Sequence, residues 1–166
     1  MDFISGLPKS EGRSVIMVVV DRITKYAHFF ALSRPFKAST VAMKFMETIQ
    51  KLHGNPKIIV SDRDPIFTGI FWTELFSCLG NKLAHSSSYH PQSDGQTEIV
   101  NKCLEGYLRC FVSDKKTKWV NCLPLVEWWY NTSFYTAAKM TPFMALYGYP
   151  KFGTKSNETT GRSKSQ

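Results

Sequence analysis

The strongest structural pattern in the sequence is VIMVVVDRITKYAHFFAL, residues 15–32. Its first half, 15–23, is almost continuously apolar and rich in β-branched residues, which is typical of a strand buried on both faces. A charged turn then leads into a second apolar run at 26–32. Together with the short alternating segment MDFI at 1–4, this stretch predicts an antiparallel meander of three strands with hairpin connections.

After this meander, helical and extended patterns alternate along the chain. The expected elements are a helix at 39–53, a strand at 57–62, a helix at 69–80, a strand at 82–87 and helices at about 94–113, 117–132 and 141–147. The first of these helices is expected to bury Val41, Phe45, Met46, Ile49 and Leu52. Parallel crossovers added to an antiparallel meander predict an α/β fold with a mixed five-stranded sheet flanked by helices.

Composition indicates one folded domain. The chain has 166 residues, of which 43% are hydrophobic, and this is enough for a sizeable core. Residues 1–150 form the expected domain, and 151–166 reads as a disordered basic tail because it has no large apolar residue after Phe152. No apolar run approaches the roughly 18–20 residues of a membrane span, and the start of the chain does not read as a secretory leader.

The net charge favours a polyanionic partner. The chain carries 21 basic and 13 acidic side chains, a formal charge of +8. Because acids are few, a group of acids that gathers in one place needs an explanation.

The cysteines and histidines do not suggest a metal site. No C-x-x-C pair occurs, and the apolar surroundings of the cysteines predict buried, reduced thiols; these are Cys78, Cys103, Cys110 and Cys122. The histidines do not combine with them at zinc-finger spacing, so no zinc site is expected.

Three acids lie where a mixed sheet would bring them together. Asp2 is on the first strand, Asp62 closes the strand at 57–62, and Glu98 begins the helix that follows the last strand. Catalytic groups gather beyond the carboxyl ends of parallel strands. Because clustered carboxylates raise one another's pKa values, they need a cation to stay ionised. Mg²⁺ suits such a site, and two ions about 4 Å apart would support phosphoryl transfer.

Other acids compete for this role. By spacing alone, Asp21 at the end of a buried strand is as good a ligand as Asp2, although an aspartate there also suits a hairpin turn. Asp64 is better explained by the turn before Pro65, and Asp94 by a helix cap or loop. From the residues alone, the choice between Asp2 and Asp21 stays open.

The segment HPQSDGQTEIVNK, 90–102, begins with turn formers and continues as a helix with two distinct faces. Its polar stripe is expected to contain Glu98, Asn101, Lys102, Glu105 and Arg109, and its apolar face Val100, Cys103, Leu104, Tyr107 and Leu108. Such a helix would bury one side and direct an acid, an amide and two bases toward a site. Lys102 would contact phosphate, or else form a helical pair with Glu98 on a solvated face.

The aromatic segment VEWWYNTSFY, 126–135, has two interpretations. It could stack nucleic-acid bases. Core packing and contact with a second copy of the chain explain it better, because adjacent aromatic residues on a helix cannot all face the same way.

Between Asp62 and Glu98 there are 98 − 62 − 1 = 35 residues. With this spacing, the sequence resembles the D,D-35-E integrases, closest to the catalytic core of gypsy-type LTR-retrotransposon integrases. The matching stretches are MDFISGLP, VIMVVVDRITKYAHFFAL, IIVSDRDPIFTGIFW, SSSYHPQSDGQTEIVNKCLEGYLR and WYNTSFYTAAKMTPFMALYGYP, in this order over residues 1–150.

The resemblance implies an RNase H-like fold and a DNA strand transferase that uses two Mg²⁺ or Mn²⁺ ions. Carried over by position, Asp2, Asp62 and Glu98 would be catalytic and would ligate the metal, with Asp2 bridging both ions. The family's flexible loop implies DNA contacts from Tyr89, His90, Gln92 and Ser93, and the polar stripe implies further contacts from Asn101, Lys102 and Arg109. His90 as a general base is the weaker interpretation.

The resemblance also implies a homodimer or higher assembly, and chromosomal DNA as the target implies the nucleus of a host cell. Family members carry a zinc-binding domain upstream and a small DNA-binding domain downstream. Since neither is found in the sequence, we expect a fragment of a decayed or mis-delimited retroelement. Three functions follow: an integrase core that processes and joins DNA 3′ ends, a related nuclease, or a non-catalytic nucleic-acid-binding or dimerisation remnant.

Overall fold

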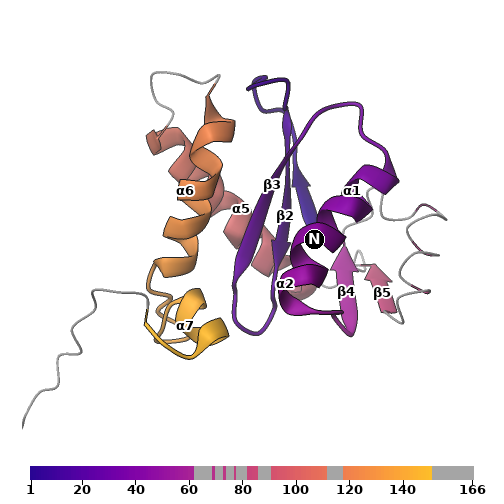
Figure 1. Cartoon of the computed structure of the whole chain (residues 1–166). Coiled ribbons are helices and arrows are strands. Elements are labelled where there is room, and N and C mark those ends of the chain that lie inside the picture. The colour runs from indigo at the N-terminus through magenta and orange to yellow at the C-terminus, as the bar shows by residue number, and fades with distance from the viewer. Residues whose placement is uncertain are drawn as a thin grey trace, which may run out of the picture.

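The computed structural model describes residues 1–61, 69, 73, 77, 82–85, 91–111 and 118–150, without the side chains of 82–85, 91–98 and 111. Its strands are β1 (Asp2–Ile4), β2 (Val15–Val20), β3 (Ala27–Leu32), β4 (Ile58–Ser61) and β5 (Lys82–His85). Its helices are α1 (Ala38–Phe45), η1 (Met46–Gln50), α2 (Lys51–His53), α5 (Pro91–Phe111), α6 (Trp119–Thr132) and α7 (Pro142–Tyr147). Figure 1 shows the resulting α/β fold, as predicted.

The predicted meander is confirmed. β1 pairs antiparallel with β2, with Asp2 opposite Val18, and β2 pairs antiparallel with β3 along its whole length. The β2–β3 hairpin closes where the N–H of Asp21 donates to the carbonyl of Tyr26, at 2.8 Å.

The single five-stranded sheet is not confirmed. The structure has a three-stranded sheet, β1-β2-β3, and a two-stranded parallel sheet, β4-β5. The two sheets meet where the amino group of Met1 donates to the carbonyl of Val60, at 2.6 Å. This bond lies at the end of the described part of β4, and the residues that would continue a parallel pairing with β1, from Asp62 onward, fall outside those described.

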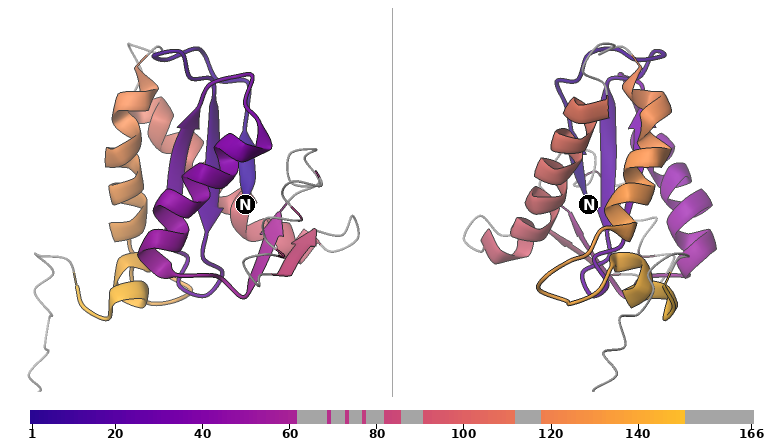
Figure 2. Two further views of the ribbon diagram at one scale, coloured as in Figure 1. Left: turned by 45° about the vertical axis from the view of Figure 1, so that its right-hand side comes forward. Right: turned by 90° about the vertical axis from the view of Figure 1, so that its left-hand side faces the viewer.

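Helices cover both faces of the three-stranded sheet (Figure 2). On β2, Ile16 and Val18 face α5 and α6, whereas Val15 and Met17 face α1 and η1. This alternation follows from the two-residue period of a strand. All four side chains are fully buried, which confirms that β2 is covered on both sides.

The helix predicted at 39–53 is present, but its buried stripe is shorter than expected. Val41, Phe45 and Ile49 are buried as predicted, whereas Met46 is 37% and Leu52 61% exposed. The segment η1 is a π-helix, and its wider turn carries an extra residue. The buried face is therefore rotated, and Leu52 points away from the sheet.

Helix α5 begins at Pro91, three residues earlier than predicted. Proline is favoured at the first helical position because it lacks an N–H that would be unpaired there and has a fixed φ angle. Helix α7 begins as predicted: Thr141 caps it by accepting the N–H of Met144, and Pro142 follows the cap. The helix predicted at 69–80 and the tail at 151–166 fall on residues outside those described, apart from Gly69, Thr73 and Ser77.

Within the described part of the chain, no helix combines the length and apolar character needed to cross a bilayer.

Candidate active site

Both carboxylate oxygens of Asp2 accept hydrogen bonds. The N–H of Phe3 donates to Oδ1 at 2.7 Å, and the side-chain amide of Asn101 donates to Oδ2 at 2.6 Å. Asp2 is partly buried at the start of β1, and Asn101 projects from α5. The contact therefore joins the first strand to the helix that carries Glu98.

The amide oxygen of the Asn101 side chain accepts no hydrogen bond from the described residues. This oxygen, Oδ1, is buried. A buried acceptor without a partner costs about 1–3 kcal/mol. A carboxylate beside a free amide oxygen offers hard oxygen donors, which Mg²⁺ prefers. The residues at this position therefore fit a divalent cation.

The end of β4 lies beside β1. The Met1–Val60 hydrogen bond brings Asp2 next to the last residues of β4, where Ser61 is fully buried. Asp62 is the next residue in the sequence and lies outside the described residues. Glu98 belongs to α5, one turn before Asn101, and its side chain is likewise outside the described part.

The structure thus brings together Asp2, the end of β4 and the turn of α5 that contains Glu98. Whether the three carboxylates meet stays a prediction. Among the described side chains, no group of three or more His, Cys, Asp or Glu residues is placed to hold a metal ion.

The two predicted faces of α5 are largely present. Val100, Leu104 and Leu108 are buried at 2%, 0% and 6% exposure, and Lys102 and Arg109 are exposed. This apolar stripe, in the middle and C-terminal half of α5, packs against Ile4 of β1 and against Ile16 and Val18 of β2.

The predicted burial of the cysteines is wrong for two of them, because Cys103 and Cys110 are exposed. The buried stripe repeats every four residues from Val100. Cys103 and Cys110 flank that stripe, so neither reaches the sheet.

The predicted DNA-binding loop is partly helical. Gln92 and Ser93 lie in the first turn of α5, so the expectation of a loop at these positions is wrong. Tyr89 and His90 fall outside the described residues. Asn101, also predicted to contact DNA, donates its side-chain N–H to Asp2 instead of pointing to solvent.

The competing acid Asp21 has a structural role. Its Oδ2 accepts the backbone N–H of Thr24 at 2.9 Å and the Thr24 hydroxyl at 2.5 Å. Burial raises the pKa of Asp21, but these bonds, together with the Ile23 N–H and the charge of Lys25, lower it more. This geometry agrees with the turn-forming interpretation. Asp94 lies in the first turn of α5, and Asp64 is outside the described residues.

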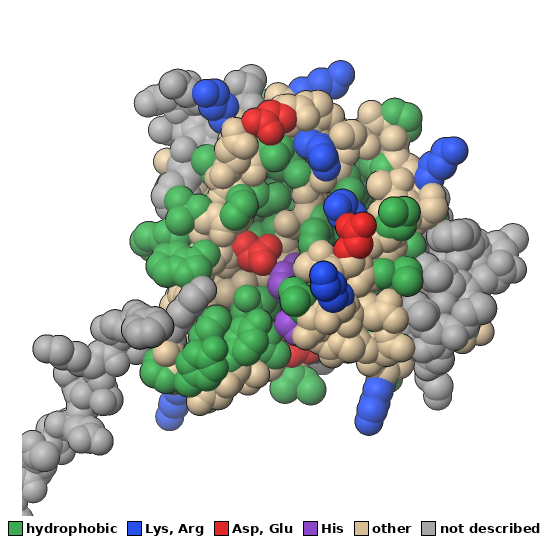
Figure 3. Space-filling view, viewed as in Figure 1, with side chains coloured by type: hydrophobic (Ala, Val, Ile, Leu, Met, Phe, Trp, Pro, Cys, Tyr) green, Lys and Arg blue, Asp and Glu red, His purple; other side chains and the backbone are tan. Residues whose placement is uncertain are grey.

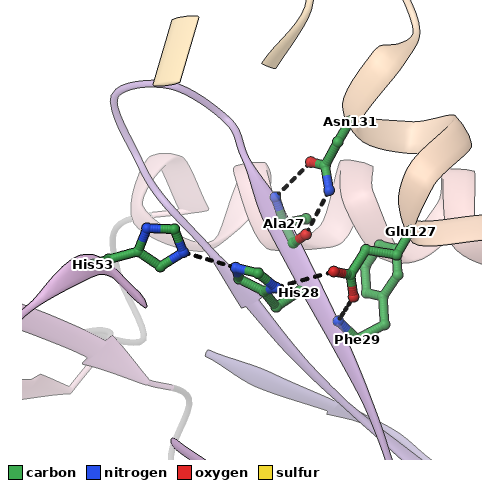
Figure 4. A network of polar contacts seen from close by, with 6 residues as sticks. All are labelled: Ala27, His28, Phe29, His53, Glu127 and Asn131. Atoms are coloured by element: carbon green, nitrogen blue, oxygen red, sulfur yellow. Dashed lines mark hydrogen bonds and ion pairs between the residues drawn. The ribbon is translucent and has the colours of Figure 1, made fainter. Parts of the chain in front are cut away.

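A second polar cluster connects β3 to α6 and α2 (Figure 4). Nδ1 of His28 lies 3.0 Å from Oε1 of Glu127, and Nε2 of His28 lies 2.9 Å from Nε2 of His53. The other oxygen of Glu127 accepts the N–H of Phe29 at 2.8 Å. One carboxylate therefore anchors both a side chain and the backbone of β3.

Asn131 repeats this arrangement one helical turn later on α6. Its side chain accepts from the N–H of Ala27 at 2.9 Å and donates to the Ala27 carbonyl at 2.8 Å. No local sequence pattern indicates the roles of Glu127 and Asn131, because each bonds to β3 residues about 100 positions away.

The outer face of α6 exposes an apolar patch, part of which is visible in Figure 3. Leu125, Trp128 and Trp129 are 45%, 47% and 44% exposed. The two indole rings pack edge to face, with centroids 6.2 Å apart. Tyr130 is partly buried against the core, so the adjacent aromatic residues of α6 do not all face the same way, as expected.

The sequence is similar to segments of curated retrotransposon proteins. The Tf2-3 and Tf2-4 polyproteins of Schizosaccharomyces pombe are each 36% identical to it over 169 residues, covering 96% of this chain. The chain spans 13% of the length of these relatives. No protein-family model matches the chain.

The fold is similar to solved viral structures. A chain of the simian T-cell lymphotropic virus intasome, solved with PP2A regulatory subunit B56 gamma, has a TM-score of 0.74 and 20% identity, covering 99% of this chain and 59% of its own. The HTLV-2 integrase catalytic core with magnesium, in its trimeric form, has a TM-score of 0.68 and 16% identity. The match covers 87% of this chain and 93% of the HTLV-2 chain. The BIV integrase catalytic core has a TM-score of 0.66 and 21% identity, and the match covers 86% of this chain and 90% of the BIV chain.

Proposed function

Since the chain is homologous to a segment of Tf2 retrotransposon polyproteins and has the fold of retroviral integrase catalytic cores, we propose that it is an integrase core. In this role it inserts element DNA into host DNA by processing 3′ ends and then transferring them to target phosphodiesters. The single observation that carries the proposal is the contact between Asp2 and Asn101, because it places a predicted catalytic acid against α5.

In the proposed site, Asp2, Asp62 and Glu98 hold two Mg²⁺ or Mn²⁺ ions. When bound, such ions stabilise the attacking and leaving oxygens of phosphoryl transfer. Asn101 orients the Asp2 carboxylate, and its free Oδ1 is available to a cation or to a water molecule bound to one. The magnesium in the HTLV-2 structure supports the choice of metal.

DNA is the proposed substrate and partner. Lys102 and Arg109 are exposed on the same helix as the acid Glu98, and each would contact a phosphate as a positive charge. Tyr89, His90, Gln92 and Ser93 would contact the DNA ends ahead of or within the first turn of α5. The net charge of +8 supports a polyanionic partner of this kind. Action on chromosomal DNA would place the protein in the nucleus.

The active assembly is proposed to be a homodimer or larger. The exposed patch of Leu125, Trp128 and Trp129 supports self-association, because clustered aromatic residues are enriched at protein interfaces. The dimeric and trimeric forms of the HTLV-2 catalytic core provide parallel cases. The same patch favours the second candidate function, a non-catalytic dimerisation and nucleic-acid-binding remnant.

Strand transfer on short DNA duplexes tests the proposal. The wild-type chain should give joined products with Mg²⁺ or Mn²⁺, and both Glu98→Gln and Asp2→Asn should abolish them. Glu105→Gln is the matched control, because Glu105 is exposed on the same helix and lies outside the site. If no metal-dependent product forms, or if the Glu98→Gln protein keeps full activity, the enzyme proposal fails and the remnant function is left.

A further inference from the structure

Two histidine side chains meet between β3 and α2, with their Nε2 atoms directed at each other (Figure 4). Nε2 of His28 lies 2.9 Å from Nε2 of His53, and the ring centroids are 5.2 Å apart. His28 is buried on β3, whereas His53 is the last residue of α2 and is exposed. The pair therefore has one member in the core and one member that solvent reaches.

Glu127 fixes the protonation and the orientation of the His28 ring. Its Oε1 lies 3.0 Å from Nδ1 of His28, and its Oε2 accepts the N–H of Phe29. An ionised carboxylate can only accept, so Nδ1 of the neutral imidazole carries the proton and Nε2 keeps its lone pair. Histidines that ligate a metal usually have such a carboxylate behind the ring, because it selects this tautomer and makes the ring more basic. The lone pair of His28 is directed at His53.

The contact between the two rings depends on one shared proton. Because Nε2 of His28 accepts, Nε2 of His53 donates in the neutral pair. A divalent metal ion can take the place of that proton, since it accepts the Nε2 lone pairs of both rings while the proton moves to Nδ1 of His53. Both rings stay neutral, so coordination needs no further reactant.

The spacing of the two rings is close to that of two metal ligands. In a tetrahedral zinc site, Zn–N bonds of about 2.0–2.1 Å separate two nitrogen ligands by about 3.3 Å. The Nε2 atoms of the pair, now 2.9 Å apart, would have to separate by about 0.4 Å. His53 can supply this shift because it is exposed at a helix end, while Glu127 keeps His28 in place. The same exposure leaves the remaining coordination positions to water.

Ligand chemistry separates this pair from the candidate active site. Imidazole nitrogens suit zinc, copper and nickel, whereas the oxygens of Asp2 and Asn101 suit magnesium. Zinc-finger spacing does not predict the pair, because His28 and His53 are 25 positions apart and meet only in the folded chain. Since two described side chains would act as ligands, we expect weaker binding than in a structural site with four protein ligands.

We propose that His28 and His53 form a binding site for a divalent transition metal ion of the zinc class, with water as the remaining ligands. Glu127 is a positioning residue, because it contacts His28 and not the ion. The ion would join α2 to β3, which Glu127 already ties to α6, and would stabilise the folded chain. The proposal does not depend on the proposed enzymatic function, since it involves neither Asp2 nor α5.

Titration of the full chain with Zn²⁺ in a calorimeter, near neutral pH, tests the proposal. Excess Mg²⁺ is present throughout, so that the acids of the candidate active site are supplied with the ion they prefer. We expect a single Zn²⁺ ion per chain. With free Zn²⁺ at about 100 times its Kd, Tm should rise by about 5–10 °C. Co²⁺ gives a second readout, because its visible absorption changes when imidazole replaces water.

Four variants, each checked for folding by circular dichroism, locate the ion. His53→Gln keeps a side chain that can donate to His28 but removes a ligand, so it should lose Zn²⁺ binding, the Co²⁺ signal and the rise in Tm. Glu127→Gln should weaken Zn²⁺ binding by about 10–100-fold and keep the Co²⁺ spectrum. Asp2→Asn and His85→Gln are the controls and should bind Zn²⁺ as the wild type does. The first removes an acid of the candidate active site, and the second removes an imidazole of β5.

Absence of saturable Zn²⁺ binding, or equal affinity in His53→Gln and the wild type, would overturn the proposal. The pair would then be a hydrogen bond alone. Loss of binding in Asp2→Asn would also overturn it, because the ion would belong to the acids. Unchanged affinity in Glu127→Gln would contradict the positioning role. None of these results depends on strand transfer, so a failure here is distinguishable from a failure of the proposed function.

Discussion

The side-chain amide of Asn101 lies 2.6 Å from Oδ2 of Asp2, although the two residues are 99 positions apart in the sequence. This contact ties the first strand to α5 at the turn that follows Glu98. The second carboxylate oxygen is held by the N–H of Phe3, so the orientation of the carboxylate is fixed from two sides. Asn101 is therefore a positioning residue for a predicted metal ligand.

Replacing Asn101 by alanine should lower metal-dependent strand transfer by about 10–100-fold, the usual effect of losing a residue that orients a metal ligand. The metal concentration for half-maximal activity should rise, because the Asp2 carboxylate is no longer held. Activity measured across a Mg²⁺ titration checks both expectations. Glu105→Ala, on the same helix and exposed, should change neither quantity. A variant that loses activity at all metal concentrations without a shift of the half-maximal point would contradict the positioning role.

Sequence patterns predicted the parts of this fold that depend on neighbouring residues. The alternation in β2 and the four-residue stripe of α5 come directly from strand and helix geometry, and both are present. The apolar run at 15–20 showed a strand covered on both faces because no polar residue interrupts it. Thr141 and Pro142 marked the start of α7 because capping and a fixed φ angle act locally.

The missed features depend on contacts between distant segments or on irregular backbone. The π-helical turn at Met46–Gln50 rotates Leu52 out of the core, and no periodicity rule anticipates an extra residue per turn. The contacts of Glu127 and Asn131 with β3 join residues far apart in the sequence. Within the candidate site, the acid Asp2 could be chosen over Asp21 by resemblance only, whereas its bond to Asn101 needed the structure.

Asn131→Ala should destabilise the fold by about 1–3 kcal/mol. Asn131 is buried and bonds to both the N–H and the C=O of Ala27, so the substitution leaves two backbone groups without these partners. Urea unfolding followed by circular dichroism measures the change. Asn121→Ala on the same helix is the control, since Asn121 is exposed and its bond to Glu11 lies at the surface. Similar losses in the free energy of unfolding for both variants would contradict the prediction, because the buried bonds to Ala27 would then contribute no more than a surface bond.

The fold should lose stability as the pH falls from about 7.5 to 5.5. Burial lowers the pKa of His53 in the folded state, the neighbouring His28 lowers it further, and Asp21 partly opposes both. The unfolded chain then binds a proton more readily than the folded chain, so stability is full above the ordinary histidine pKa of about 6.5 and declines below it. Denaturant midpoints at several pH values check this decline. His53→Gln keeps a side-chain donor for His28 but does not titrate, and it should make the decline shallower. An unchanged pH profile in His53→Gln would assign the effect to another group.

Lys102→Ala and Arg109→Ala should each weaken DNA binding to a similar extent for all sequences. A phosphate contact releases counterions, so each substitution should reduce the slope of log K against log salt by about 0.9. Gel shifts with a short duplex across a salt series give this slope. Lys44→Ala is the matched control, because Lys44 lies on α1 at the opposite face of the sheet and pairs with Glu47 at 3.1 Å. If Lys44→Ala lowers the slope as much as Lys102→Ala, then DNA binding depends on the overall charge of +8 and not on contacts with the exposed stripe of α5. A selective effect of Lys102 and Arg109 would place the nucleic acid along the helix that contains Glu98 and Asn101.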